Sequence, residues 1–118
     1  MNINIQRSVE YKAKCYKNVK MELRNLSMSE YKKSVKYHPA VKDKDNNIIK
    51  EPQLEYDTDI LFNCMVFNIE NLTVTDENKK VKEIKTGQDI LDNPGLNELY
   101  LELTPVLIKM EARIDSKN

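Results

Sequence analysis

His38 has the clearest capacity for chemistry, because it is the single histidine among 118 residues. A general base needs a positioned partner, and a metal site needs several ligands close together. The nearest acids, Asp43 and Asp45, lie in a segment that resembles the first half of a calcium-binding loop. The sixth position of that pattern is Ile48 rather than glycine, and the twelfth is Leu54 rather than an acid. We therefore expect no metal ion and no cofactor.

The other residue types that enzymes use form no recognised catalytic pattern. Two glycines cannot build a phosphate-binding loop, and the sequence contains no Gly-x-Ser-x-Gly motif. Asp57 and Asp59 stand at an expected helix start, where acids stabilise the positive end of the helix dipole. Asp76 and Glu77 fall in an expected turn. We expect no catalytic residues and no enzyme; the enzymatic alternative would need a site built from His38 and the loop acids.

Cysteine content and hydropathy predict the compartment. Cys15 and Cys64 lie far apart in the sequence, and we expect two small buried thiols, with a disulfide as the alternative. The longest apolar run, residues 60–69, is broken by asparagines and is far shorter than the roughly 20 residues of a membrane span. The chain does not open with a basic segment followed by an apolar one. These features predict a cytoplasmic protein that does not bind a membrane.

Charge is divided unevenly along a chain whose formal net charge is zero. Residues 1–42 contain ten basic and three acidic residues, a net charge of +7. Residues 43–118 contain the other nine basic and sixteen acidic residues, a net charge of −7. Such a chain can fold one half onto the other, stack head-to-tail with another copy, or meet a charged partner with one face.

Apolar and polar residues alternate between positions 9 and 23, which predicts an antiparallel β-hairpin at residues 8–25. A strip of basic residues on its solvent face, with Tyr16 among them, can follow a phosphate backbone and stack a base. Nucleic-acid binding or regulation is therefore the alternative function. Lysines on a strand also protect a sheet edge or meet an acidic protein. The strip consists of Lys12, Lys14, Lys20 and Arg24.

Helix and turn signals divide the rest of the chain. Ser27 and Glu30 have the spacing of a capping box, which marks a helix start. The sequence as a whole predicts one α+β domain over residues 1–118, with the N-terminal antiparallel hairpin packed against three or four helices. After the hairpin we expect a short helix at 28–37, a loop at 39–56, a core helix at 58–71, a hairpin at 72–85 and a helical region at 87–113.

The expected helix at 58–71 is apolar on nearly all sides, so it needs a cover on two sides. One of those covers can be another chain. We expect a protein partner, or a second copy of this chain, to bind apolar residues that stay exposed in the monomer. The candidate residues on this helix and on the C-terminal helix are Phe62, Phe67, Leu99 and Leu103.

Several places along the chain follow one order of elements: after a hairpin come a short helix that begins after Leu-Ser, a variable loop, a hydrophobic helix, a turn, a short polar excursion and a closing helix. These places are Leu26-Ser27 through Tyr31, Asp59 to Glu70, Asn71-Leu72, Lys79 to Thr86, and Thr86 through Leu91 to Leu103. This order resembles that of small tail proteins of long-tailed bacteriophages, including tail assembly chaperones and tail or head–tail completion proteins. The resemblance implies a non-enzymatic role in phage or prophage tail assembly. It also implies a tail or capsid component as the partner, and a location in the host cytoplasm or the virion.

Overall fold

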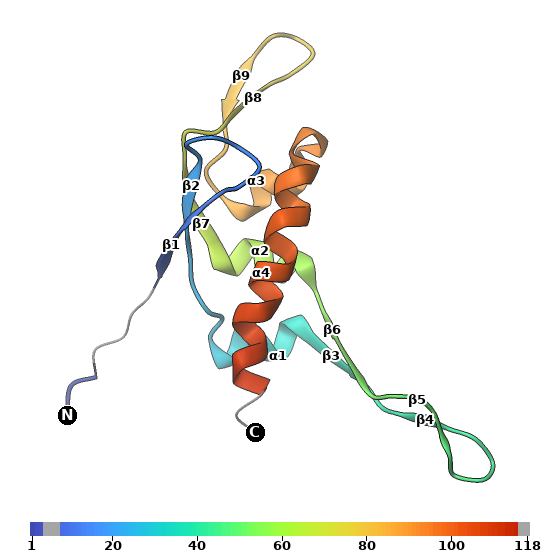
Figure 1. Ribbon diagram of the computed structural model, residues 1–118. Coiled ribbons are helices and arrows are strands. Elements are labelled where there is room, and N and C mark those ends of the chain that lie inside the picture. Colours follow the sequence, from blue (N-terminus) through green and yellow to red (C-terminus); the bar gives the residue numbers. More distant parts are fainter. Residues whose placement is uncertain (4–7, 116–118) are drawn as a thin grey trace.

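The computed structural model describes residues 1–3 and 8–115, which form an α+β fold with an N-terminal antiparallel sheet and a long C-terminal helix (Figure 1). The helices are α1 (Met28–Ser34), α2 (Thr58–Met65), α3 (Gly87–Asp92), the 3-10 helix η1 (Pro94–Leu96) and α4 (Asn97–Asp115). The strands are β1 (Val9–Lys12), β2 (Lys20–Leu23), β3 (Val35–His38), β4 (Val41–Lys42), β5 (Ile48–Lys50), β6 (Gln53–Tyr56), β7 (Val66–Glu70), β8 (Thr73–Thr75) and β9 (Val81–Glu83).

The hairpin expected at residues 8–25 is present as β1 and β2, with shorter strands than the alternating pattern suggests. Val9 pairs with Leu23 and Lys12 pairs with Lys20, and β7 joins the other edge of β2 to make a three-stranded antiparallel sheet. Met21 and Leu23 are buried, because alternate residues of β2 point to the helices. The two-residue period therefore identified the buried face of β2 correctly, whereas Val9 at the start of β1 is 44% exposed.

The prediction of one helix over residues 58–71 is wrong in its second half. α2 ends at Met65, and strand β7 begins at the next residue, Val66, without a loop. Pairing with β2 satisfies the backbone of β7 and buries Val66 and Ile69 in the core. Asn68 has a left-handed φ of 51° where the register between β2 and β7 shifts. Tertiary pairing of β-branched residues outweighs a helical spacing that these residues also fit.

The predictions of a helix over 28–37 and a loop over 39–56 are also wrong. α1 ends at Ser34, and residues 35–56 form one long β-hairpin, which we call the arm. Strands β3 and β6 make the base of the arm, and β4 and β5 make its outer part. The arm extends away from the rest of the molecule, which we call the body (Figure 1).

The amino-acid composition of the arm does not indicate its strands. Pro39 and Pro52 are typical of loops. Here Pro39 follows β3 and Pro52 precedes β6, and strand pairing is interrupted at these prolines, between the β3–β6 pair and the β4–β5 pair. The turn Asp43–Asn47 occupies only the tip. Between these breaks the strands are two to four residues long, too short for a visible alternating pattern.

The arm and the β8–β9 hairpin end in the same kind of turn. Asp43 Oδ1 accepts the N–H groups two and four residues further on, both at 2.9 Å. Asp76 Oδ1 accepts the equivalent N–H groups at 2.8 and 2.9 Å. Asn46 and Lys79 hold the left-handed position of each turn, with φ of 66° and 62°. The β8–β9 hairpin lies within residues 72–85, where the sequence predicts a hairpin.

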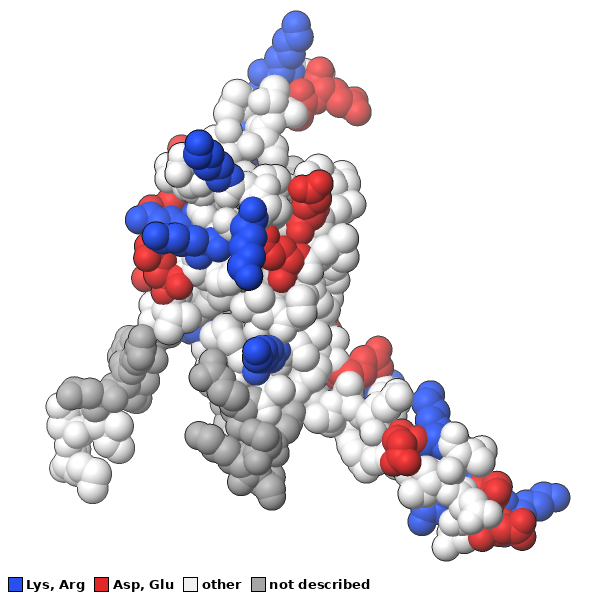
Figure 2. All heavy atoms as spheres, in the orientation of Figure 1, with Lys and Arg blue, Asp and Glu red and all other residues white. Residues whose placement is uncertain are grey.

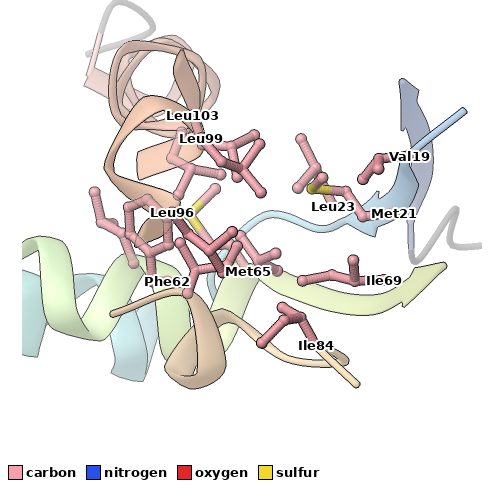
Figure 3. Packing of buried hydrophobic residues seen from close by; sticks show 14 of the residues in the cluster. Val19, Met21, Leu23, Phe62, Met65, Ile69, Ile84, Leu96, Leu99 and Leu103 are labelled. Atoms are coloured by element: carbon pink, nitrogen blue, oxygen red, sulfur yellow. The ribbon is translucent and has the colours of Figure 1, made fainter. Parts of the chain in front are cut away.

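The core lies between the central sheet, α2, α3 and α4, with side chains from all four meeting in one cluster (Figure 3). Phe62 of α2 stacks on Tyr100 of α4 with ring centroids 5.1 Å apart. A Cβ on Gly87 would lie 1.8 Å from the carbonyl oxygen of Phe62, so α3 packs directly on the backbone of α2. The helical region expected at 87–113 is present as α3, η1 and α4, and α4 continues through Pro105.

Candidate interaction surfaces

Three of the four residues that we expected to bind a partner belong to the core. Phe62, Leu99 and Leu103 are 0% exposed, so these three are not among the candidates that stay exposed in the monomer. Phe67 is half-buried on β7, opposite Glu22 of β2. Because three of these side chains fill the interior, the face of α2 and α4 that carries them holds the fold together and is not a free surface.

Two members of the basic strip are held by acids of the same chain. Lys20 Nζ lies 3.4 Å from both Glu10 and Glu70. Arg24 donates two hydrogen bonds of 3.0 Å to the carboxylate of Glu30. These bonds, together with the N–H of Ser27, lower the pKa of Glu30 to about 2. Lys20 and Arg24 therefore have structural partners already.

The other lysines of the strip surround the loop between β1 and β2. Residues 12–20 and Asn71 line an open hollow with a volume of about 780 Å³. Among the described residues, no carboxylate lies within ion-pair distance of Lys12, Lys14 or Lys17. Figure 2 shows basic side chains gathered on the face that carries this loop, with acidic ones beside them. This loop is the basic surface that remains available.

Glu102 of α4 holds the same loop in place. Its carboxylate accepts the Tyr11 hydroxyl at 2.6 Å and the N–H groups of Lys14 and Cys15 at 2.8 Å each. Burial alone would raise the pKa of Glu102, but these donors outweigh it and lower the pKa. Burial and Glu102 together raise the pKa of Tyr11 to about 12. Sequence reasoning missed Glu102, because its partners lie 87 to 91 residues away along the chain.

Both cysteines are free, half-buried thiols. Burial, with the hydrogen bond to Glu102, raises the pKa of Cys15 to about 11. Burial, with the hydrogen bond to Glu30, raises the pKa of Cys64. A thiol with a raised pKa holds little of the thiolate form that reacts as a nucleophile. The geometry therefore favours structural thiols at both positions.

His38 lies on the arm, and its ring Nε2 is 2.7 Å from Glu55 Oε2 on the facing strand. Asp43 is occupied by the turn at the tip, where its carboxylate accepts two backbone N–H groups. The histidine and the loop acids therefore do not converge on one point. In the ranges that the structure describes, no three His, Cys, Asp or Glu side chains are grouped to hold a metal ion.

The base of the arm has one apolar face and one polar face. Tyr37 pairs with Leu54 on the apolar face, and these side chains are 62% and 43% exposed. Lys36 pairs with Glu55 on the polar face. Further along the arm, Ile49 is 66% exposed. Within residues 1–3 and 8–115, no third strand pairs with either edge of the arm. The arm is thus the largest concentration of exposed apolar side chains that the structure describes.

Comparison with protein-family models, curated proteins and solved structures finds no match for the chain. Among the helices of residues 1–3 and 8–115, none is both long enough and apolar enough to cross a bilayer. Function is therefore argued from the surfaces themselves.

Proposed function

We propose that this chain is a non-enzymatic assembly protein that binds a protein partner through the arm. The observation that carries the proposal is the apolar face of the arm, where Tyr37 and Leu54 point into solvent. A two-stranded hairpin is marginally stable alone, and exposed apolar clusters mark interaction sites. A partner on this face would cover the apolar side chains and stabilise the arm.

The positions of the reactive residue types support a non-enzymatic role. Glu30 and Glu102 bind structural donors, and the thiols of Cys15 and Cys64 have raised pKa values. His38 bonds to an exposed carboxylate on the arm. Each of these side chains has a hydrogen-bond partner within the fold.

Phage or prophage tail assembly, in the host cytoplasm or the virion, is the setting we propose on the resemblance of element order. Two places in that order differ in the structure, since the apolar helix after Asp59 is half strand and the variable loop is the arm. The proposed partner class, a tail or capsid protein, would meet the arm rather than the buried face of α2.

A site-specific photocrosslinker tests the arm. Benzoylphenylalanine at Tyr37 should form a covalent adduct with a protein when cells that naturally make this chain are irradiated. The matched control is the same amino acid at Val81, which is 67% exposed on the β8–β9 hairpin. Equal labelling at both positions, or none at Tyr37, would refute a role of the arm in binding.

The loop between β1 and β2 favours a second candidate function, binding of an anionic partner such as nucleic acid. The supporting observation is that Lys12, Lys14 and Lys17 have no carboxylate partner among the described residues. Binding of a labelled single-stranded oligonucleotide should weaken with salt in proportion to the phosphates contacted. The double variant Lys12→Ala with Lys14→Ala should lower both affinity and salt slope. Absence of binding at low salt would exclude this candidate.

A further inference from the structure

The two chain segments that form the base of the arm, taken together with the ends of α1 and α2 that they join, carry opposite charges. Residues 32–42, which run from α1 along β3 and β4, contain four lysines and no acid, a charge of +4. Residues 51–59, which return along β6 into α2, contain four acids and no base, a charge of −4. We call these the basic edge and the acidic edge. Their charged residues are Lys32, Lys33, Lys36 and Lys42 on one, and Glu51, Glu55, Asp57 and Asp59 on the other.

We propose that a second copy of this chain adds to the arm edge to edge, with β3 of one copy against β6 of the next. This inference rests on the proposed function and names its partner. Charge complementarity selects the occupant: the acidic edge of a copy is the surface that fits the basic edge, and both are present on every molecule. An exposed strand edge is a ready template for another strand.

Backbone geometry leaves the required groups facing outward. Asp57 N–H donates to the carbonyl of Ser34 at 2.6 Å, so these two residues form a hydrogen-bonded pair at the root of the arm. Antiparallel pairs alternate between hydrogen-bonded and non-hydrogen-bonded. The pair Tyr37–Leu54 is three steps further on, and its backbone groups therefore point to the outer edges. A neighbouring strand can accept and donate at these positions.

One register satisfies both faces of the extended sheet. If the next copy pairs as β3 and β6 pair within one chain, Lys36 lies opposite Glu55 of the next copy on the polar face. On the apolar face, Tyr37 then lies opposite Leu54 of the next copy. A shift of one residue would reverse the faces of every side chain. Charge and hydrophobicity thus specify the same pairing.

The charges also select the symmetry of the contact. A two-fold contact would place basic edge against basic edge, or acidic against acidic, and like charges directly opposite are destabilising. Basic edge against acidic edge is a head-to-tail contact, which closes into a ring or continues as a filament. The division of charge along the sequence, +7 over residues 1–42 and −7 over residues 43–118, places the basic edge in one part and the acidic edge in the other.

Reversing the charge of Lys36 or of Glu55 tests the inference, with the mass of the particles in solution as the measurement. At low salt the natural chain should increase in mass with concentration by light scattering. It should return to the monomer mass at about 1 M salt, where screening acts within about 3 Å. At the Lys36–Glu55 pair, Lys36→Glu places an acid on both edges, and Glu55→Lys places a base on both edges. Each variant alone should stay monomeric, and an equal mixture should assemble again, because unlike edges are once more available.

Matched controls separate the edge from general charge effects. Lys80→Glu and Glu77→Lys make the same changes on the β8–β9 turn, and both should assemble like the natural chain. Recovery in the mixture, and in the double variant Lys36→Glu with Glu55→Lys, would exclude misfolding of the single variants. A natural chain that is monomeric at low salt would overturn the inference. So would single variants that assemble normally, or a mixture that stays monomeric.

The crosslinking experiment keeps the two proposals distinct. A monomeric chain whose Tyr37 position still crosslinks to a different protein would overturn self-assembly and leave the assembly function standing. A chain that is monomeric and forms no adduct through the arm would overturn both. Crosslinks between copies, together with recovery in the mixture, would support both.

Discussion

The body and the arm treat apolar residues in opposite ways. In the body, Phe62, Leu99 and Leu103 are fully buried, although their pattern on the helices suggested a free face. In the arm, Tyr37 and Leu54 are exposed, although Tyr37 was expected at the end of a short helix and Leu54 in a loop. The comparison teaches that a strongly apolar helix marks the core, whereas a weakly apolar segment that projects from the core leaves its apolar side chains exposed.

The largest difference between the body and the arm is expected when one aromatic residue is truncated in each region. Phe62→Ala removes a ring stacked on Tyr100 in the core, and it should lower the free energy of unfolding by about 3–5 kcal/mol. Tyr37→Ala on the arm should change it by less than about 0.5 kcal/mol in the monomer. Urea denaturation at low protein concentration measures both. A loss at Tyr37 that matched the loss at Phe62 would mean that the arm is packed within the monomer.

Adding a methyl group tests how tightly the body is packed. Gly87→Ala places a Cβ 1.8 Å from the carbonyl oxygen of Phe62, so α2 and α3 must move apart. We expect a loss of about 1–3 kcal/mol, the usual range for overpacking. Gly95→Ala is the matched control, because no atom lies within 4 Å of its added Cβ. Thermal unfolding that ranked both variants with the natural chain would show that the α2–α3 contact is loose.

The pH dependence of stability should come from the body acid Glu30 rather than the arm acid Glu55. Arg24 and the N–H of Ser27 lower the folded pKa of Glu30 from its ordinary 4.5 to about 2. A carboxylate whose pKa is lower in the folded than in the unfolded state stabilises the fold at pH values above its unfolded pKa. This stabilisation is lost as the pH falls from about 4.5 to about 2. Glu30→Gln should cost about 1–2 kcal/mol at pH 7 and flatten the curve across that window.

Glu55→Gln supplies the comparison for that experiment. Its carboxylate also has a lowered pKa, caused by the hydrogen bond with His38, but it is exposed on the arm. Because solvent screens this carboxylate, the stability of the Glu55→Gln monomer should equal that of the natural chain at each pH between 7 and 2. If Glu55→Gln flattened the curve as strongly as Glu30→Gln, the arm would unfold together with the body.

The two Asp turns give the smallest effect. Asp43→Ala and Asp76→Ala each remove two hydrogen bonds from a hairpin tip, and each should destabilise its own hairpin by about 1 kcal/mol. Amide hydrogens of that hairpin should then exchange about fivefold faster, as seen by mass spectrometry. Exchange in β2 and α4 should not change. Faster exchange throughout the body after Asp43→Ala would show that the arm and the body open as one unit.

The N-terminal hairpin, its buried face and the C-terminal helices could be predicted from the sequence, because each has a local cause. Alternation buries Met21 and Leu23, and Ser27 with Glu30 forms the predicted capping box. The Asp turns also follow local rules. Backbone preference and side-chain capping act within a few residues, so they are readable without a structure.

The candidate surfaces could not be predicted, because their causes are distant pairings. Val66–Glu70 fits a helix by spacing and becomes a strand only because β2 lies beside it. Glu102 binds groups about ninety residues away. The arm depends on pairing between residues about twenty apart, with prolines between its segments. In each case the local sequence pattern does not indicate which distant residues form the pairing partner.

The hydrogen bond between Asp57 N–H and the carbonyl of Ser34 allows the length of the arm to change during evolution without changing the body. The chain leaves the body and re-enters it at one point, so the distance between α1 and α2 does not depend on what lies beyond. Residues can be gained or lost two at a time on each of the two strands while the faces and the edge charges keep their phase. Related chains can therefore differ in arm length in paired steps, and that length would set how far an assembled neighbour stands from the body.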